Sequence, residues 1–250
     1  MSAEKFEYLC RLGDSTLIIG QQLGKWCGHA PILEEDIAVA NTALDLIGQA
    51  TMWLDYAGRV EGKGRTADDL AYFRDSRAFR NVLLVEQPNG DFGATLMRQF
   101  LFDAWHLPLL EQLLSSTDPE ISAIAGKAEK EARYHLRRSA SLVERLGLGT
   151  DDSHQRMQEA LLALWPFTGE LIEADDVDGI AQAEGYGADT VTTAEEACGN
   201  WSKTLLQAGL IVPDDVHMRV GGKSGLHSEG LGYVLAEMQC LARSMPGAKW

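Results

Sequence analysis

The chain opens with an apolar helical pattern, EKFEYLCRLGDSTLIIGQQLGKW, at residues 4–26. Its apolar residues recur mostly at three- and four-residue spacings, which is the period of one buried helix face. Three glycines, Gly13, Gly20 and Gly24, lie inside this pattern and lower its helix propensity. We therefore expect a buried helix that approaches another backbone closely at its glycines.

Three further long helices are predicted between Pro31 and Gly147. Pro31, followed by acidic residues at 34–36, begins a helix that runs to about Gly58. An apolar pattern over about 96–109 predicts the next helix, and Asp118-Pro119-Glu120 predicts the start of one that ends at Gly147. One long connection joins the helix that ends near Gly58 to the helix at about 96–109, and such a crossover is typical of ferritin-like bundles.

The remainder of the chain predicts additional helices. They are expected at about 153–174, with a break at Pro166, at 193–208 and at 228–244. Thr193-x-x-Glu196 has the form of a capping box for the second of these. The fold class is therefore all-α: one domain over residues 1–250, with a long-helix bundle at about 4–147 and a C-terminal helical extension at about 150–250.

Composition excludes several classes of function. The formal net charge of -15 repels phosphate backbones, which argues against nucleic-acid binding and is compatible with a basic protein partner. No run of about 18 apolar residues occurs, so no membrane span is expected. The four cysteines are widely spaced and form no metal or disulfide pattern. A soluble protein in a reducing cytoplasm is the expectation.

Metal-ligand motifs are scarce in this chain. Ferritin-like di-iron proteins carry Glu-x-x-His on two of their helices, and none of the six histidines here follows a glutamate at that spacing. On the predicted helices, Asp103 and His106 lie one turn apart and His135 follows Ala132. A polar pair and a buried histidine are the favoured interpretations, because these groups are too few to hold two irons.

Several segments resemble the C subunits of bacterial 1,2-phenylacetyl-CoA epoxidases, and the resemblance spans nearly the whole chain. They are LGKWCGHAP at 23–31, LVEQPNG at 84–90, KEARYHLR at 130–137, GGKSGLH at 221–227 and LAEMQ at 235–239. The resemblance implies a ferritin-like subunit of a multicomponent di-iron monooxygenase. That enzyme inserts one oxygen atom of O2 into the aromatic ring of phenylacetyl-CoA to give a 1,2-epoxide in phenylacetate catabolism.

The resemblance also implies the partners. A related A subunit would hold the di-iron centre, and a reductase with flavin and an iron–sulfur cluster would take electrons from NADPH. The C subunit would be the structural partner of A, in an assembly of two A and two C chains. The B subunit and the reductase are further candidate partners, and no cofactor is expected in this chain.

The same resemblance assigns six vestigial ligand positions, when the chain is set against the catalytic A subunit of the family. They fall at Leu17, Leu46, Gln49, Asp103, Ala132 and His135. Only Asp103 and His135 keep a ligand of the family pattern, so we expect no catalytic, cofactor-binding or metal-binding residue here. We hypothesise that Asp103 and His135 pair with each other or through Gln49.

Two alternative functions stay open. The chain could itself be an iron oxygenase with ligands drawn from Asp45, Asp103, His106 and His135, because non-heme iron works with two histidines and one carboxylate. It could instead be a free-standing acyl-CoA or nucleotide binder that uses Gly222-Lys-Ser224. That segment lacks the preceding glycine of a phosphate-binding loop, and leaves Lys223 and Ser224 as candidate contacts to an anion or a partner.

Overall fold

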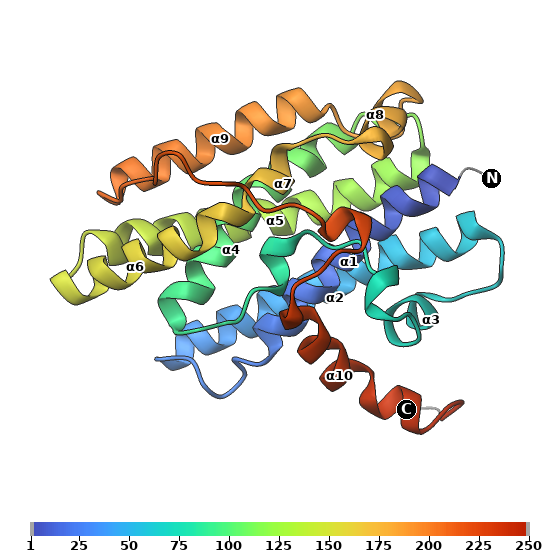
Figure 1. The fold of residues 1–250 in the computed structure, drawn as a ribbon, viewed down its shortest axis with the longest axis horizontal. Coiled ribbons are helices and arrows are strands. Elements are labelled where there is room, and N and C mark those ends of the chain that lie inside the picture. Colours follow the sequence, from blue (N-terminus) through green and yellow to red (C-terminus); the bar gives the residue numbers. More distant parts are fainter. Residues whose placement is uncertain (1–2, 249–250) are drawn as a thin grey trace. The chain divides into compact units, whose positions relative to one another are not determined.

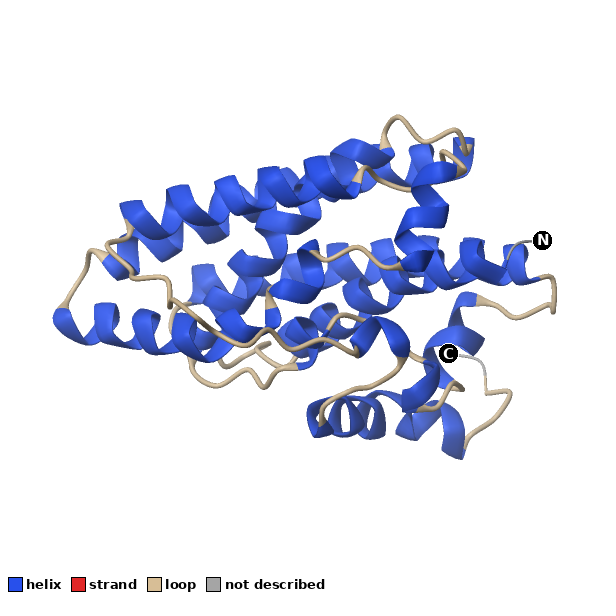
Figure 2. Cartoon of the chain, turned by 45° about the horizontal axis from the view of Figure 1, so that its top comes forward, coloured by secondary structure: helices blue, strands red, loops and turns tan. Residues whose placement is uncertain are grey.

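The computed structural model describes residues 3–248, and all regular structure in that range is helical (Figure 1 and Figure 2). The α-helices are α1 Ala3–Gly24, α2 Leu33–Glu61, α3 Ala67–Tyr72, α4 Phe92–Leu113, α5 Pro119–Gly147, α6 Asp151–Leu164, α7 Gly169–Ile172, α8 Asp176–Ala183, α9 Thr190–Gln207 and α10 Glu229–Ser244. Short 3-10 helices are η1 Ser76–Ala78, η2 Leu83–Glu86, η3 Trp165–Phe167 and η4 Gly222–Ser224.

The helices belong to two compact units. Unit 1 consists of the chain up to Pro88 together with the segment from Gly221 onward, and unit 2 is the intervening segment Asn89–Val220. The predicted C-terminal extension at 150–250 is thus divided: α6 to α9 belong to unit 2, whereas α10 belongs to unit 1.

Unit 1 is built on the pair α1 and α2, which pack side by side in opposite directions (Figure 1). A Cβ atom at Gly13 would lie 2.7 Å from the Leu54 side chain, and one at Gly20 would lie 3.0 Å from Ile47 Cγ1. These glycines therefore permit the close helix approach that we predicted from the sequence. The prediction is wrong for Gly24, where no neighbouring atom lies within 4 Å of such a Cβ.

Polar side chains join the smaller elements of unit 1 to this pair. Arg74, just after α3, forms a buried ion pair with Asp14 of α1. Gln239 of α10 donates hydrogen bonds to the carbonyl oxygens of Ala71 and Arg74, at 2.9 and 3.0 Å. Helix α10 is therefore hydrogen-bonded directly to α3 and to the loop that follows it.

Unit 2 is built on α4 and α5, with α6 and α9 packed against both. Helix α4 is buried along almost its whole length. Two side chains of α9 bind its backbone: Trp201 Nε1 donates to the Leu101 carbonyl at 3.0 Å, and Asn200 Nδ2 donates to the Ala104 carbonyl at 3.1 Å. These bonds fix the register between α9 and α4.

Most helix predictions agree with the structure, and the differences are helix α8, which was not predicted, and several helix ends. The helix predicted from Pro31 begins at Leu33, because Asp36 accepts hydrogen bonds from the Gly28 and Ala30 amides and holds residues 28–30 in a loop. The cap predicted at Thr193 is wrong. Asp189 is the N-cap of α9, and it accepts a hydrogen bond from the Thr192 amide at 2.8 Å.

Candidate functional site

Three of the six vestigial ligand positions lie in unit 1. Leu17 belongs to α1, and Leu46 and Gln49 lie one turn apart on α2. All three side chains are buried. The two leucines carry no lone pair that a metal could use, so Gln49 is the one possible ligand among these three positions.

The other three positions lie in unit 2, on α4 and α5, and are also buried. Asp103 is the centre of a polar cluster there. Its Oδ1 accepts a hydrogen bond from Gln99 Nε2 at 2.6 Å, and its Oδ2 accepts one from Ser139 Oγ at 2.8 Å. Each carboxyl oxygen therefore accepts a hydrogen bond from a side chain of the same unit.

Burial dominates the electrostatics of this cluster. It raises the pKa of Asp103 to about 6, against the charge of His135 and the bonds from Ser139 and Gln99, all of which lower that pKa. The hypothesis that Asp103 and His135 interact directly thus has electrostatic support within unit 2. The alternative hypothesis, in which Gln49 bridges the two residues, involves both units and stays a prediction.

His106 is the second histidine of this region. Burial, together with the charge of His135, lowers its pKa to about 3, so the His106 ring is neutral at pH 7. The ring lies 4.8 Å from the centroid of Phe102 and stacks on Trp105 at 6.2 Å. Its Nδ1 is buried and has no hydrogen-bond partner among residues 3–248. This histidine is packed as an aromatic side chain.

The donor set does not fit a di-iron centre. Leu17, Leu46 and Ala132 offer no ligand atom, so half of the six positions cannot bind a metal. Within the described range, no group of three or more histidine, cysteine, aspartate or glutamate side chains is arranged to hold a metal ion. Of the alternative ligands, Asp45 lies on α2 in unit 1, and Asp103, His106 and His135 lie in unit 2.

A second buried cluster joins the two chain segments of unit 1, the one that ends at Pro88 and the one that begins at Gly221. His227 Nδ1 lies 2.9 Å from Glu86 Oε2, and its Nε2 lies 3.0 Å from the Phe79 carbonyl oxygen. Both neighbours are acceptors, so the doubly protonated ring satisfies both. Glu86 also accepts hydrogen bonds from Asn81 Nδ2 at 3.1 Å and from the Ser228 amide at 2.6 Å.

The pKa of His227 agrees with this geometry. Burial lowers that pKa, but the bonds to Glu86 and to the Phe79 carbonyl oxygen, together with the charge of Glu86, more than offset the effect and raise it overall. The segments LVEQPNG and GGKSGLH, which are far apart in the sequence, thus meet at an ion pair whose side chains are 4% and 0% exposed.

The loop that carries Lys223 and Ser224 is folded on itself. The amides of Ser224 and Leu226 donate to the Gly221 carbonyl oxygen, and the Gly225 amide donates to that of Gly222. Ser224 Oγ donates to the Gly221 carbonyl oxygen at 2.9 Å. Gly225 has a φ of 82°, and a Cβ there would lie 2.5 Å from the Arg77 carbonyl oxygen. The glycines therefore serve a tight turn that packs against η1.

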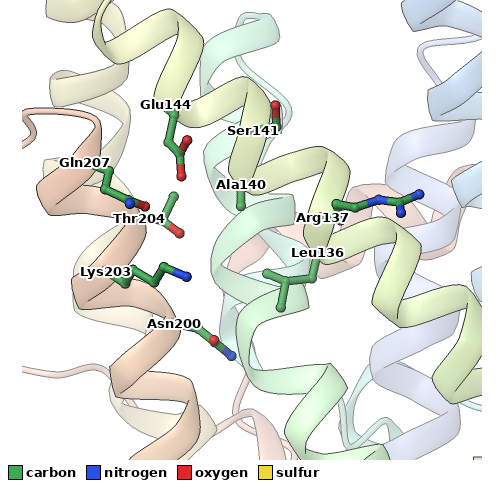
Figure 3. Close-up of a pocket in the computed structure, with 9 residues that line it drawn as sticks. All are labelled: Leu136, Arg137, Ala140, Ser141, Glu144, Asn200, Lys203, Thr204 and Gln207. Carbon is green, nitrogen blue, oxygen red and sulfur yellow. The ribbon is translucent and has the colours of Figure 1, made fainter.

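An open cavity of about 400 Å³ lies between α5 and α9 in unit 2. Figure 3 shows Glu144 of α5 and Lys203 of α9 directed into the space between the two helices, whereas Arg137 points away from α9. Thr204 and Gln207 also line this cavity. Its walls combine one acid, cations and neutral polar groups, and no charge type predominates.

Comparison with known proteins places the chain in a family. The family model for phenylacetic acid catabolic proteins matches residues 1–250. The chain belongs to that family. A curated member, the C subunit of the 1,2-phenylacetyl-CoA epoxidase of Escherichia coli (strain K12), is 51% identical over 243 residues, which are 97% of this chain and 98% of the relative.

A solved structure supports the fold of this phenylacetic acid catabolic protein. It is a protein with aldehyde deformylating oxidase activity from Synechococcus, with a TM-score of 0.59 and 15% identity, covering 84% of this chain and 93% of its own. This similarity shows the fold alone, an all-α, ferritin-like helical bundle with additional C-terminal helices. No helix within residues 3–248 is long and apolar enough to cross a membrane.

Sequence reasoning identified part of these sites. Asp103, His106 and His135 were named as candidates and lie together in unit 2. The roles of Glu86, Asn81 and Ser139 were missed. Glu86 is only one acid among 37 acidic residues. The one available signal was its place in a segment that carries the family resemblance.

Proposed function

We propose that this chain is the non-catalytic structural subunit of a multicomponent di-iron monooxygenase that epoxidises the aromatic ring of phenylacetyl-CoA in phenylacetate catabolism. The similarity to the C subunit of the Escherichia coli epoxidase carries this proposal, because it extends over nearly the full length of both chains. Apolar residues at three of the six ligand positions, Leu17, Leu46 and Ala132, support a role without metal chemistry.

The proposed partner is the catalytic A subunit, in an assembly of two A and two C chains. That subunit would hold the two irons, and an associated reductase with flavin and an iron–sulfur cluster would supply electrons from NADPH. The B subunit and the reductase are further proposed partners. We place the complex in the cytoplasm, where the exposed Cys27, Cys198 and Cys240 stay reduced.

In this function the chain supplies a rigid helical scaffold. The Asp103 cluster and the apolar residues at the former ligand positions fill the interior with packed or hydrogen-bonded groups. Such an interior stabilises the helix pairs, whose outer surfaces are then available to hold a partner. The chemistry is assigned to the partner.

Iron content tests this assignment directly. The chain and the A subunit are expressed separately with iron supplied, freed of adventitious metal in the same way, and assayed for iron. We expect close to none in this chain and about two irons per A chain, as di-iron bundles hold. About two irons in this chain would overturn the structural role and favour an oxygenase with atypical ligands.

Reconstitution tests the rest of the proposal. Epoxidation of phenylacetyl-CoA is measured with the A subunit, B subunit and reductase, with and without this chain. We expect activity only when the chain is present. Full activity without it would contradict the proposal, and tight binding of an acyl-CoA by the isolated chain would favour the free-standing binder.

A further inference from the structure

Three large apolar side chains are exposed on the outward face of α2. Leu33, Ile37 and Leu44 are 71%, 53% and 67% exposed. The exposed residues Asn41, Gly48 and Thr51 complete the same line at three- and four-residue steps. We call these six residues the α2 outer stripe. At 1.5 Å per residue, the stripe is roughly 27 Å long.

The opposite face of α2 is apolar as well. Leu46, Ala50, Trp53 and Leu54 are buried there, and α2 packs against α1. A helix at the surface of a globular protein normally has one apolar face. Because α2 already buries one face, the exposed Leu33, Ile37 and Leu44 on its other side are additional apolar surface that a partner could cover.

Charge restricts what can cover this stripe. Between Trp26 and Gly58 the chain has no lysine or arginine. The acids of this segment are Glu34, Glu35, Asp36, Asp45 and Asp55. A second copy of the chain, docked face to face, would bring acidic flanks against acidic flanks, which disfavours binding. A partner with basic flanks would instead be attracted.

We propose that the α2 outer stripe docks against an apolar helix of the catalytic A subunit that is flanked by lysine or arginine side chains. This inference rests on the proposed function and adds to it the surface and the chemistry of contact. The apolar side chains would supply affinity by leaving water, and the acidic flanks would select the partner and accelerate its association.

The first test places a cation in the stripe. Ile37→Arg and Leu44→Arg are compared with Leu206→Arg, a matched control on α9 whose side chain is 81% exposed. Unchanged melting temperatures establish that each variant is folded. Binding to the purified A subunit is measured by calorimetry. We expect about a tenfold or greater loss of affinity for the two stripe variants, and less than about a twofold change for the control.

The second test addresses charge. The double variant Glu34→Lys and Asp45→Lys reverses two acids near the stripe. We expect slower association with the A subunit and a weaker dependence of affinity on salt than in the wild type. Unchanged rates at low ionic strength would contradict the basic flanks of the proposed partner helix.

The outcomes separate the two proposals. If the wild-type chain fails to bind the A subunit, the proposed function fails and this inference fails with it. If the wild type binds and the stripe variants bind equally well, only the inference is overturned. It is also overturned if sedimentation of the chain alone shows a dimer that Leu44→Arg dissociates, because a second copy would then be the occupant.

Discussion

At the scale of single residues, Asp103 couples the stability of unit 2 to pH. Its carboxyl group is buried between Gln99 and Ser139, and its pKa is raised from 3.8 to about 6. The folded protein therefore binds this proton more tightly than the unfolded chain does. Stability should fall as the pH rises from about 4 to about 6.

Asp103→Asn removes this dependence, because the amide stays neutral and can still bond to both neighbours. We expect the variant to be more stable than the wild type by about 1 to 3 kcal/mol above pH 6, and nearly equal to it at pH 4. Urea unfolding at several pH values measures the difference. Asp68→Asn, at an exposed position of α3, should leave the pH dependence unchanged. Equal stability of wild type and Asp103→Asn at pH 7 would contradict the prediction.

The pair of Glu86 and His227 also loses stability as the pH rises, but over a higher pH range than Asp103. The raised pKa of His227 means that its contribution to stability is fully present below pH 6.5 and is lost as the pH rises through the higher folded-state value. We expect His227→Gln to cost roughly 2 to 4 kcal/mol at pH 6, since it leaves a buried carboxylate without its cation. Thermal unfolding should show a smaller loss at pH 9. Ser224→Ala, in the same loop, is the matched control.

Such residue-scale features are only partly readable from a sequence. Asp103 and His135 could be named because they lie on helices with a recognisable period. Glu86 could not be paired, because His227 is 141 residues away in the sequence. Nothing local indicates that a carboxylate in a short turn will be buried by a segment so distant.

At the scale of helices, N-terminal capping residues determine where each helix begins. Asp118 accepts hydrogen bonds from the amides of Glu120 and Ile121 at 2.8 and 3.1 Å. We expect Asp118→Ala to cost about 1 kcal/mol, because it exposes two amide donors of α5. Asp118→Asn should keep most of that stability, since asparagine also caps helices. Chemical unfolding distinguishes the two, and equal losses would contradict a capping role.

The sequence predicted the long helices better than the short ones and better than the helix starts. Apolar periods predicted α1 and α4, and start signals at Pro31 and Asp118 predicted α2 and α5. Helix α8 was not predicted, since its eight residues are too few for a period to emerge. The start of α9 was misplaced because Asp189 and Thr193 both have capping chemistry, and tertiary context decides between them.

At the scale of the whole molecule, the sequence supported an all-α, ferritin-like bundle with C-terminal helices, and the structural comparison shows that fold. It did not indicate that α10 belongs with α1 to α3. That grouping depends on Gln239 reaching the carbonyl oxygens of Ala71 and Arg74, and on His227 reaching Glu86. Contacts over such separations leave no periodic trace in a sequence.

This grouping predicts the effect of a truncation. Removal of the chain from Gly221 onward takes away His227, which pairs with Glu86, and Gln239, which donates to the carbonyl oxygens of Ala71 and Arg74. We expect amide hydrogen exchange to accelerate in α3 and η2, while α4 and α5 in unit 2 keep most of their protection. Equal acceleration in both units would contradict the division. Replacement of the tail by an unrelated segment of the same length is the control for chain length.

The late position of His227 also bears on how the protein is made. The ribosome synthesises the chain from the N-terminus to the C-terminus. All of unit 2 therefore emerges before His227, whose imidazole completes unit 1. Throughout that interval Glu86 lacks its cation, and the α1–α2 hairpin waits for its last helix. A nascent chain stalled before Ser228 should therefore be recognised by chaperones through its N-terminal third, although that third was the first part to be synthesised.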